Sequence, residues 1–136
     1  MRITMIGTGY VGLVSGVCFS DFGHDVTCVD RDEDKIRQLE AGKVPIFEPG
    51  LDRLLDKNVA AGRLRFTTQL ANGMQGADAV FIAVGTPTRR GDGHADLTYV
   101  FNAAEELATL ISQYTVVVKI STPEWYFDSI WTKLPR

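Results

Sequence analysis

The chain has 136 residues, of which 45% are hydrophobic and 23% are charged. This is enough for one domain with a buried core and too little for two ordinary domains. The formal net charge of −3 argues against a nucleic acid or an anionic membrane held by a broad basic surface. No apolar run approaches the roughly 20 residues of a membrane span, and the start has no signal-peptide layout. We therefore expect a cytoplasmic protein with neither of these partners.

Two cysteines, Cys18 and Cys28, lack the CxxC or Cys/His spacing of a metal or redox site. Both lie in apolar runs, where a thiol packs like a small hydrophobic side chain. We predict structural roles for both cysteines and no metal site.

Short apolar runs rich in β-branched residues alternate with segments that carry apolar residues at helical spacing. In chain order, the expected elements are strand 2–6, helix 10–22, strand 25–30, helix 32–41, a short helix from 51 to about 62, strand 64–67, strand 79–84, helix 97–112 and strand 115–120. The last two strands are nearly uninterrupted in apolar residues, as buried parallel strands are. The helix between them is long enough for a right-handed crossover. The pattern predicts a single α/β domain.

A glycine turn, GTGYVG at residues 7–12, matches GxGxxG. It directly follows the first predicted strand and opens the first predicted helix, and Asp30 ends the second strand at the distance that a dinucleotide fingerprint requires. In such a turn, Gly7 permits the tight bend, Gly9 lets a pyrophosphate approach the backbone, and Gly12 lets the helix pack close to the strand. The free N–H groups of the helix then hold the phosphates. The sequence predicts a Rossmann-type, doubly wound parallel sheet.

The end of the second predicted strand indicates which dinucleotide is bound. Asp30 can accept both hydroxyls of an adenosine ribose, whereas a 2′-phosphate would place a dianion against its carboxylate, so we expect NAD rather than NADP. Arg31 is able to pair with a 2′-phosphate, but beside Asp30 we interpret it as stacking on adenine or as solvated. Lys35 lies one helical turn further on, where it either reaches the ribose side of the ligand or is simply solvated.

The segment VGTPT, residues 84–88, follows the fourth predicted strand. Ligands of open α/β folds bind at this carboxyl edge of the sheet, so we expect Thr86 and Thr88 to offer hydroxyl groups to the cofactor. The next segment, RRGDGH at 89–94, is polar and glycine-rich and predicts a mobile surface loop with a solvated His94.

Five segments, MIGTGYVGLVSG, CVDRDEDKI, PIFEPGLDRLL, DAVFIAVGTPT and DLTYVFNAAEEL, follow one another in the chain. Together they resemble the UDP-glucose/GDP-mannose dehydrogenase family, most closely its bacterial UDP-glucose 6-dehydrogenases, over residues 1 to about 118. The resemblance implies that Val11, Asp30, Lys35 and Thr88 contact the cofactor, and that Thr122 matches a threonine near the nicotinamide. The complete predicted cofactor site is Gly7, Gly9, Tyr10, Val11, Gly12, Asp30, Arg31, Lys35, Thr86, Thr88 and Thr122.

The resemblance also implies an activity. Such enzymes oxidise the C6 alcohol of a nucleotide sugar to a carboxylate in two NAD-dependent steps, through a covalent intermediate on a cysteine. In the family pattern, that cysteine and the sugar-nucleotide domain come after the part that corresponds to residues 1–136. Neither Cys18 nor Cys28 can replace that cysteine. We therefore expect NAD binding without catalysis here, and a nucleotide sugar as partner only of the full-length parent. The alternatives are a free-standing NAD-sensing module, or a parent that acts on GDP-mannose or a UDP-N-acetyl sugar.

After Val118 the sequence departs from the family pattern, so we predict an NAD-binding domain at 1–122 and a divergent tail at 123–136. At the start of the tail, Glu124 has capping-box spacing to Ser121, which lies just before it. An apolar stripe then follows at helical spacing, formed by Phe127, Ile130, Trp131 and Leu134. We predict an amphipathic helix that packs on the sheet or pairs with a second chain in a homodimer; a disordered remnant is the alternative.

Overall fold

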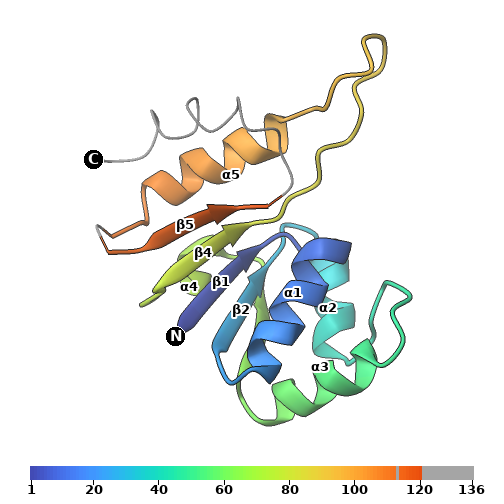
Figure 1. Cartoon of the computed structure of the whole chain (residues 1–136), viewed down its shortest axis with the longest axis vertical. Helices are drawn as coiled ribbons and strands as arrows, with labels where there is room; N and C mark the ends of the chain where they lie inside the picture. Colours follow the sequence, from blue (N-terminus) through green and yellow to red (C-terminus); the bar gives the residue numbers. More distant parts are fainter. Residues whose placement is uncertain (113, 121–136) are drawn as a thin grey trace.

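A five-stranded parallel sheet forms the centre of the computed structural model, which describes residues 1–112 and 114–120 (Figure 1). The strand order is β3-β2-β1-β4-β5, so the order reverses direction at β1. The strands are β1 (Arg2–Ile6), β2 (Asp25–Val29), β3 (Leu64–Thr67), β4 (Ala79–Ile82) and β5 (Val116–Lys119). Ile3 of β1 pairs with Val26 of β2 on one side and Ala79 of β4 on the other. The doubly wound parallel sheet that the sequence predicted is confirmed.

Helices cover both faces of this sheet. They are α1 (Tyr10–Asp21), α2 (Glu33–Glu40), α3 (Leu51–Ala60), α4 (Leu70–Gly73) and α5 (Thr98–Ala108). One core cluster joins α1, α2 and α3 to one face, with Met5, Leu13 and Leu55 fully buried. The other joins α4 and α5 to the opposite face. Each face of the sheet thus has its own apolar core beneath its helices, and the carboxyl edge of the sheet lies between the two helical layers.

The contact between α1 and β2 is unusually close. A Cβ atom at Gly16 would lie 2.7 Å from the Sγ of Cys28, a distance that real Cβ atoms do not adopt. Glycine at this position therefore lets α1 lie directly on β2, with Leu13 and Val17 fully buried beside it. This packing fixes the start of α1 relative to the ends of β1 and β2.

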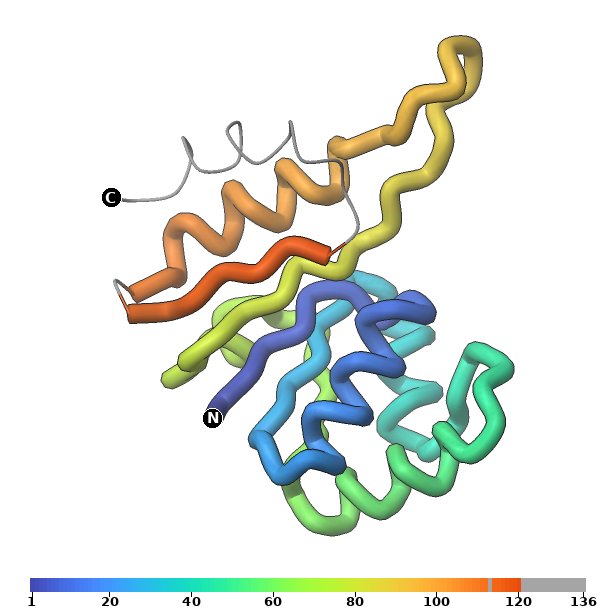
Figure 2. Tube along the Cα trace, in the orientation of Figure 1, coloured from blue at the N-terminus to red at the C-terminus, as the bar shows by residue number. Residues whose placement is uncertain are grey.

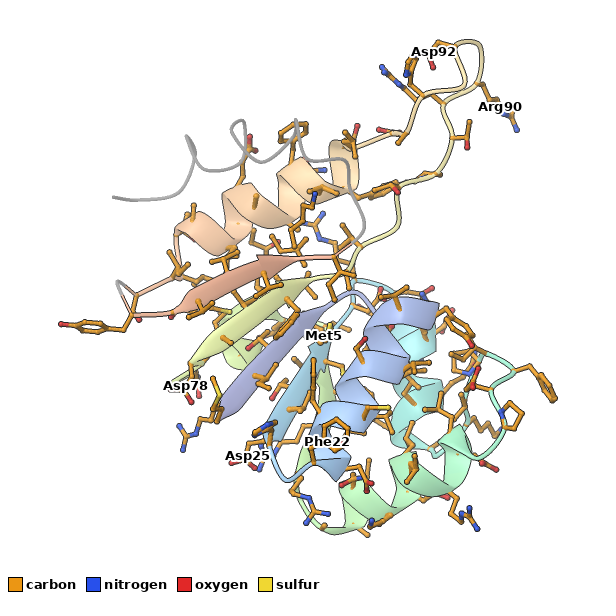
Figure 3. All side chains as sticks on the ribbon, viewed as in Figure 1. Met5, Phe22, Asp25, Asp78, Arg90 and Asp92 are labelled. Carbon is orange, nitrogen blue, oxygen red and sulfur yellow. The ribbon has the colours of Figure 1, made fainter. Side chains whose placement is uncertain are left out.

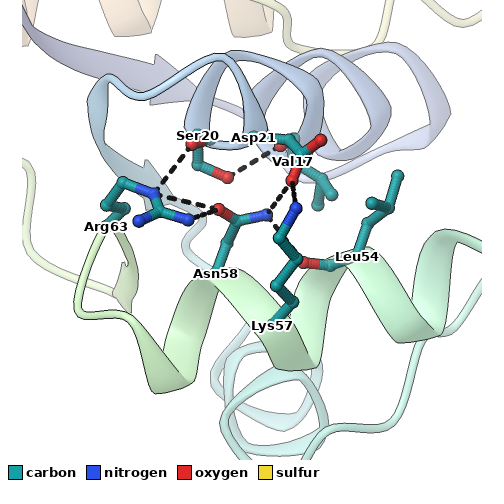
Figure 4. Close-up of polar contacts among 7 residues, drawn as sticks. All are labelled: Val17, Ser20, Asp21, Leu54, Lys57, Asn58 and Arg63. Carbon is teal, nitrogen blue, oxygen red and sulfur yellow. Dashed lines mark hydrogen bonds and ion pairs between the residues drawn. The ribbon is translucent and has the colours of Figure 1, made fainter.

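A polar network ties the far end of α1 to α3 and to Arg63, the residue before β3 (Figure 4). The fully buried Asn58 donates from Nδ2 to Asp21 Oδ1 at 3.1 Å and to the Leu54 carbonyl at 2.8 Å. Its Oδ1 accepts from Nη2 of Arg63 at 2.9 Å, while Lys57 pairs with the same Asp21 oxygen at 2.7 Å. Every polar atom of the Asn58 side chain thus has a partner, as a buried amide requires.

The connection between β4 and α5 projects away from the sheet (Figure 2). The sequence predicted a mobile surface loop at residues 89–94, and in the structure the residues that flank this loop, Thr88 and Ala95, form an antiparallel bridge. Arg89 N–H donates to the His94 carbonyl at 2.7 Å. Figure 3 shows Arg90 and Asp92 at the tip of this hairpin, far from Met5 in the sheet.

Most predicted elements are present with ends shifted by a few residues, and α4 was not anticipated. The domain boundary at residue 122 and the helix expected in the tail, 123–136, lie outside the described residues.

Candidate functional site

A cavity of about 650 Å³ opens at the carboxyl edge of the sheet, where the strand order reverses. The ends of four strands line it, together with residues of α2, α4 and α5. The lining includes Gly7 and Gly9 after β1, Asp30 and Arg31 after β2, Val84 and Gly85 after β4, and Tyr99, Asn102 and Glu106 of α5. Open α/β sheets bind their ligands in this place, and the volume is of the size that small-molecule and cofactor sites have.

In the glycine turn after β1, each of the three glycines stands at its position for a different structural reason. Gly7 has φ +102°, and a Cβ there would lie 2.6 Å from the Ala83 carbonyl oxygen. A Cβ at Gly12 would lie 2.0 Å from the Gly7 carbonyl oxygen, so a side chain would push α1 off the turn. At Gly9 a Cβ would meet nothing within 4 Å, although Gly9 lines the cavity. Gly7 and Gly12 therefore serve the fold, and Gly9 leaves room for a ligand.

The start of α1 is suited to an anion. Gly9 is the N-cap residue and makes no side-chain cap, and the first turn carries no acidic residue. The leading N–H groups of a helix have no partner within the helix, and they carry the positive end of its dipole. A phosphate group that approaches the open side of Gly9 would meet these groups.

The carboxylate of Asp30 is held in one orientation by its neighbours. Its Oδ2 accepts from the Thr8 backbone N–H at 2.9 Å and from the Thr8 hydroxyl at 2.7 Å, and Lys35 Nζ lies 3.5 Å away. Its Oδ1 accepts from the Asp32 N–H at 3.0 Å. Since a carboxylate offers about four lone-pair positions, Oδ1 keeps more capacity for a further donor than the crowded Oδ2.

The protonation state of Asp30 follows from the same contacts. Burial by itself raises the pKa of this carboxyl, but the hydrogen bonds from Thr8 and Asp32 and the charge of Lys35 outweigh it. The pKa therefore lies below its ordinary value, so the group is ionised at neutral pH and acts as an acceptor. Such a group suits the hydroxyls of a ribose.

Arg31 makes a contact that the sequence did not suggest. Its Nη2 lies 2.7 Å from Oε2 of Glu106 on α5, so an ion pair joins two walls of the cavity.

Lys35 contacts Asp30 from the first turn of α2. The N-cap residue of this helix, Asp32, accepts a hydrogen bond from the Lys35 backbone N–H at 3.0 Å. The cap on α2 thus positions the lysine beside the carboxylate.

The remaining predicted site residues lie elsewhere. The Tyr10 hydroxyl donates to Glu48, and Tyr10 and Val11 are exposed without lining the cavity. Pro87 lines it, whereas Thr86 and Thr88 do not, because the chain leaves the sheet edge there to enter the hairpin. Thr122 lies outside the described residues. The cofactor roles of these residues stay predictions.

Thr8 and the face of α5 that lines the cavity were not predicted from the sequence. Thr8 fills a variable position of GxGxxG, so the pattern assigns it no role. The polar side chains at positions 99, 102 and 106 of α5 share one helix face, but such a face is as typical of a solvated helix.

The cysteines stand apart from the cavity. Cys28 is fully buried, which raises the pKa of its thiol to about 12, and neither Cys28 nor the half-buried Cys18 lines the cavity. Over residues 1–112 and 114–120, no three His, Cys, Asp or Glu side chains are grouped to hold a metal ion. No helix in this same part of the chain has the length and apolar character to span a membrane.

Comparison with known proteins gives consistent matches. The sequence model for the NAD binding domain of the UDP-glucose/GDP-mannose dehydrogenase family matches residues 1–125, which extends past the limit near Val118 that the sequence suggested. A UDP-glucose 6-dehydrogenase of Rhizobium meliloti (strain 1021) is 66% identical over 122 residues, 90% of this chain and 28% of that protein. One of Bacillus subtilis (strain 168) is 53% identical with the same coverage. The chain thus spans little more than a quarter of these relatives.

Solved structures agree with the fold. The GDP-mannose dehydrogenase of Pseudomonas aeruginosa, a ternary complex, has a TM-score of 0.88 and 36% identity, and the match covers 98% of this chain and 31% of that one. A UDP-D-ManNAc dehydrogenase from Pyrococcus horikoshii has a TM-score of 0.88 and 30% identity over 96% of this chain and 31% of that one.

Proposed function

This chain belongs to the UDP-glucose/GDP-mannose dehydrogenase family, of which it is the NAD-binding domain, and we propose that it serves an enzyme that oxidises UDP-glucose to UDP-glucuronate. The part of this function that the chain performs is the binding of NAD, and the observation that carries it is the Asp30 carboxylate, held by Thr8 beside the open glycine turn. The identity to UDP-glucose 6-dehydrogenases of two bacteria supports the choice of sugar.

In this proposal each part of the cavity holds one part of NAD. The pyrophosphate lies against Gly9 and the N–H groups at the start of α1. The adenosine ribose donates its hydroxyls to Asp30, chiefly to Oδ1, which accepts from Asp32 alone among the described contacts. Lys35 balances the negative charge of the carboxylate at 3.5 Å. The other half of the dinucleotide follows the β4 end along Val84 and Pro87.

NAD, when bound, supplies the acceptor for a hydride from the sugar C6. Conversion of an alcohol to a carboxylate removes four electrons, so each sugar consumes two NAD. The residues of this chain bind and orient the cofactor, and the family resemblance implies that the attacking cysteine belongs to the part of such enzymes that this chain does not span. The chain alone therefore binds NAD and produces no NADH from UDP-glucose.

The nucleotide sugar is accordingly a partner of the longer enzyme. The homodimer through the tail and the cytoplasmic location expected from the sequence stay predictions.

A chimera tests whether this chain can serve such an enzyme as its NAD-binding part. Residues 1–119 of this chain replace the matching segment of the Rhizobium meliloti enzyme, and NADH is followed at 340 nm with UDP-glucose. We expect two NADH for each UDP-glucose, because the remainder of the chimera comes from a UDP-glucose 6-dehydrogenase. The same chimera carrying Asp30→Ala is the matched control and should need much more NAD. A folded chimera that binds NAD but does not oxidise UDP-glucose would contradict the proposal, and NADH production by the 136-residue chain alone would contradict its inactivity.

A further inference from the structure

The Arg31–Glu106 ion pair lies at the ribose end of the cavity. Arg31 follows Asp30 directly in the chain, and its guanidinium reaches across to α5, where Nη2 lies 2.7 Å from Glu106 Oε2. All three residues line the same cavity. The side chains of Arg31 and Glu106 are 71% and 44% exposed, so solvent and dissolved ions reach the pair.

Charge at this end of the cavity is dominated by carboxylates. Asp30, Asp32 and Glu106 line it together with two cations, Arg31 and Lys35. Lys35 faces Asp30 at 3.5 Å, and Arg31 faces Glu106. Each cation is therefore already matched by a carboxylate before a ligand enters.

A ligand that differs from NAD by a 2′-phosphate would need one of these cations. A guanidinium binds a phosphate through two parallel hydrogen bonds, and an arginine close to the ribose is the group that accommodates a 2′-phosphate in dinucleotide-binding domains. Here the arginine is engaged elsewhere. A 2′-phosphate would have to displace the Glu106 carboxylate and then lie near it, or bind without Arg31.

We propose that Glu106 is a specificity-determining residue, which holds Arg31 in an ion pair and so denies it to the 2′-phosphate of NADP. The inference rests on the proposed ribose site at Asp30. Asp30 repels the 2′-phosphate directly, and Glu106 removes the cation that would offset this repulsion. Because the pair is exposed, its contribution is modest, on the order of three- to tenfold in relative affinity.

The test uses two probes that differ by the 2′-phosphate alone, 5′-AMP and adenosine 2′,5′-bisphosphate. Their dissociation constants are measured by calorimetry for the 136-residue chain, for Glu106→Gln, and for Glu40→Gln as a matched control, since Glu40 is exposed at the end of α2 and does not line the cavity. We expect Glu106→Gln to shift the affinity ratio toward the bisphosphate by about three- to tenfold. Glu40→Gln should leave the ratio within about twofold.

A second background isolates the role of Arg31. In a chain that carries Arg31→Ala, the effect of Glu106→Gln on the ratio should largely disappear, because no guanidinium remains to be released. Higher salt should also reduce the effect, since exposed charges are screened.

The outcomes separate the inference from the site on which it rests. If the unsubstituted chain binds neither NAD nor 5′-AMP, the ribose site and this inference both fail. If the chain binds both but Glu106→Gln leaves the ratio unchanged, only the role of Glu106 is overturned. An equal shift with and without Arg31 would mean that Glu106 acts through its own charge, and would overturn the restraint of Arg31.

Discussion

Thr8 donates two hydrogen bonds to a single oxygen of Asp30, one from its backbone N–H at 2.9 Å and one from its hydroxyl at 2.7 Å. The two residues are 22 positions apart, and they join the glycine turn after β1 to the end of β2. These bonds hold the glycine turn and the carboxylate proposed to bind the ribose as one unit. Such preorganisation reduces the ordering that binding would otherwise require.

Loss of the Thr8 hydroxyl should weaken this unit. Thr8→Val keeps the shape and the backbone donor but removes the 2.7 Å bond to a partly buried carboxylate. Because Thr8 is 1% exposed, water cannot replace the bond, and we expect a loss of about 1–2 kcal/mol in the free energy of unfolding. Urea denaturation at pH 7 measures it. Equal stability of Thr8→Val and the unsubstituted chain would show that the hydroxyl bond contributes nothing net.

Asp30 should make the free energy of unfolding depend on pH in the acid range. Its pKa in the folded chain is below the ordinary value, so the unfolded chain binds the proton more readily. The stabilisation is complete above the unfolded pKa of about 3.9 and is lost as the pH falls through that value toward the folded pKa. Asp30→Asn has no carboxyl group at this position to take up that proton. Its free energy of unfolding should therefore fall less than that of the unsubstituted chain as the pH drops from about 5 to the onset of acid unfolding. Parallel pH curves for the two chains would refute this assignment.

The three glycines of the turn should separate stability from binding. Gly12→Ala would place a Cβ 2.0 Å from the Gly7 carbonyl oxygen, and we expect a loss of about 3 kcal/mol or failure to fold. Gly9→Ala meets nothing within 4 Å, so its melting temperature should stay close to that of the unsubstituted chain while NAD binding weakens at least tenfold. Thermal melts and NAD titrations measure both effects. A Gly9→Ala chain that binds NAD normally would place the pyrophosphate elsewhere.

The Asn58 network should act on stability alone. Asn58→Ala leaves Arg63 and the partly buried Leu54 carbonyl without their amide partner, and we expect a loss of about 2–3 kcal/mol. Asn72→Ala is the control, because Asn72 is exposed and bonds to Gln69 within the same turn; it should cost less than about 0.5 kcal/mol. The folded Asn58→Ala chain should keep its NAD affinity. A loss of affinity in the folded fraction would mean that this network supports the cofactor site.

The thiol of Cys28 should be inert in the folded chain. With a pKa of about 12, its thiolate fraction at pH 7 is on the order of 10⁻⁵, and the side chain is fully buried. Titration with a thiol-reactive disulfide at pH 7 should therefore modify the half-buried Cys18 before Cys28, which should react on addition of denaturant. Rapid native modification of Cys28 in a Cys18→Ser chain would contradict the packing of α1 on β2.

Local patterns in the sequence predicted much of this molecule. The glycine turn and Asp30 were identified because turn geometry and strand ends depend on neighbouring residues. The strands were found because buried parallel strands are apolar throughout. Contacts between distant segments were not predicted, and the Arg31–Glu106 pair joins residues 75 positions apart. No pattern sets which residue of α5 faces Arg31, because that depends on how α5 packs on the sheet.

Two other features escaped prediction for physical reasons. The hairpin between β4 and α5 has glycines at positive φ at Gly91 and Gly93, and its polar composition is equally typical of an irregular loop. The helix α4 has four residues, too few for an apolar period to be seen.

Binding of NAD at Asp30 is tested most directly by calorimetric titration of the 136-residue chain with NAD and with NADP, repeated for Asp30→Ala. We expect saturable binding of one NAD, weaker binding of NADP, and a loss of about 1–3 kcal/mol in the free energy of NAD binding when the Asp30 carboxylate is removed. Tighter binding of NADP than of NAD, or an Asp30→Ala chain that folds and binds NAD as tightly as the unsubstituted one, would contradict it.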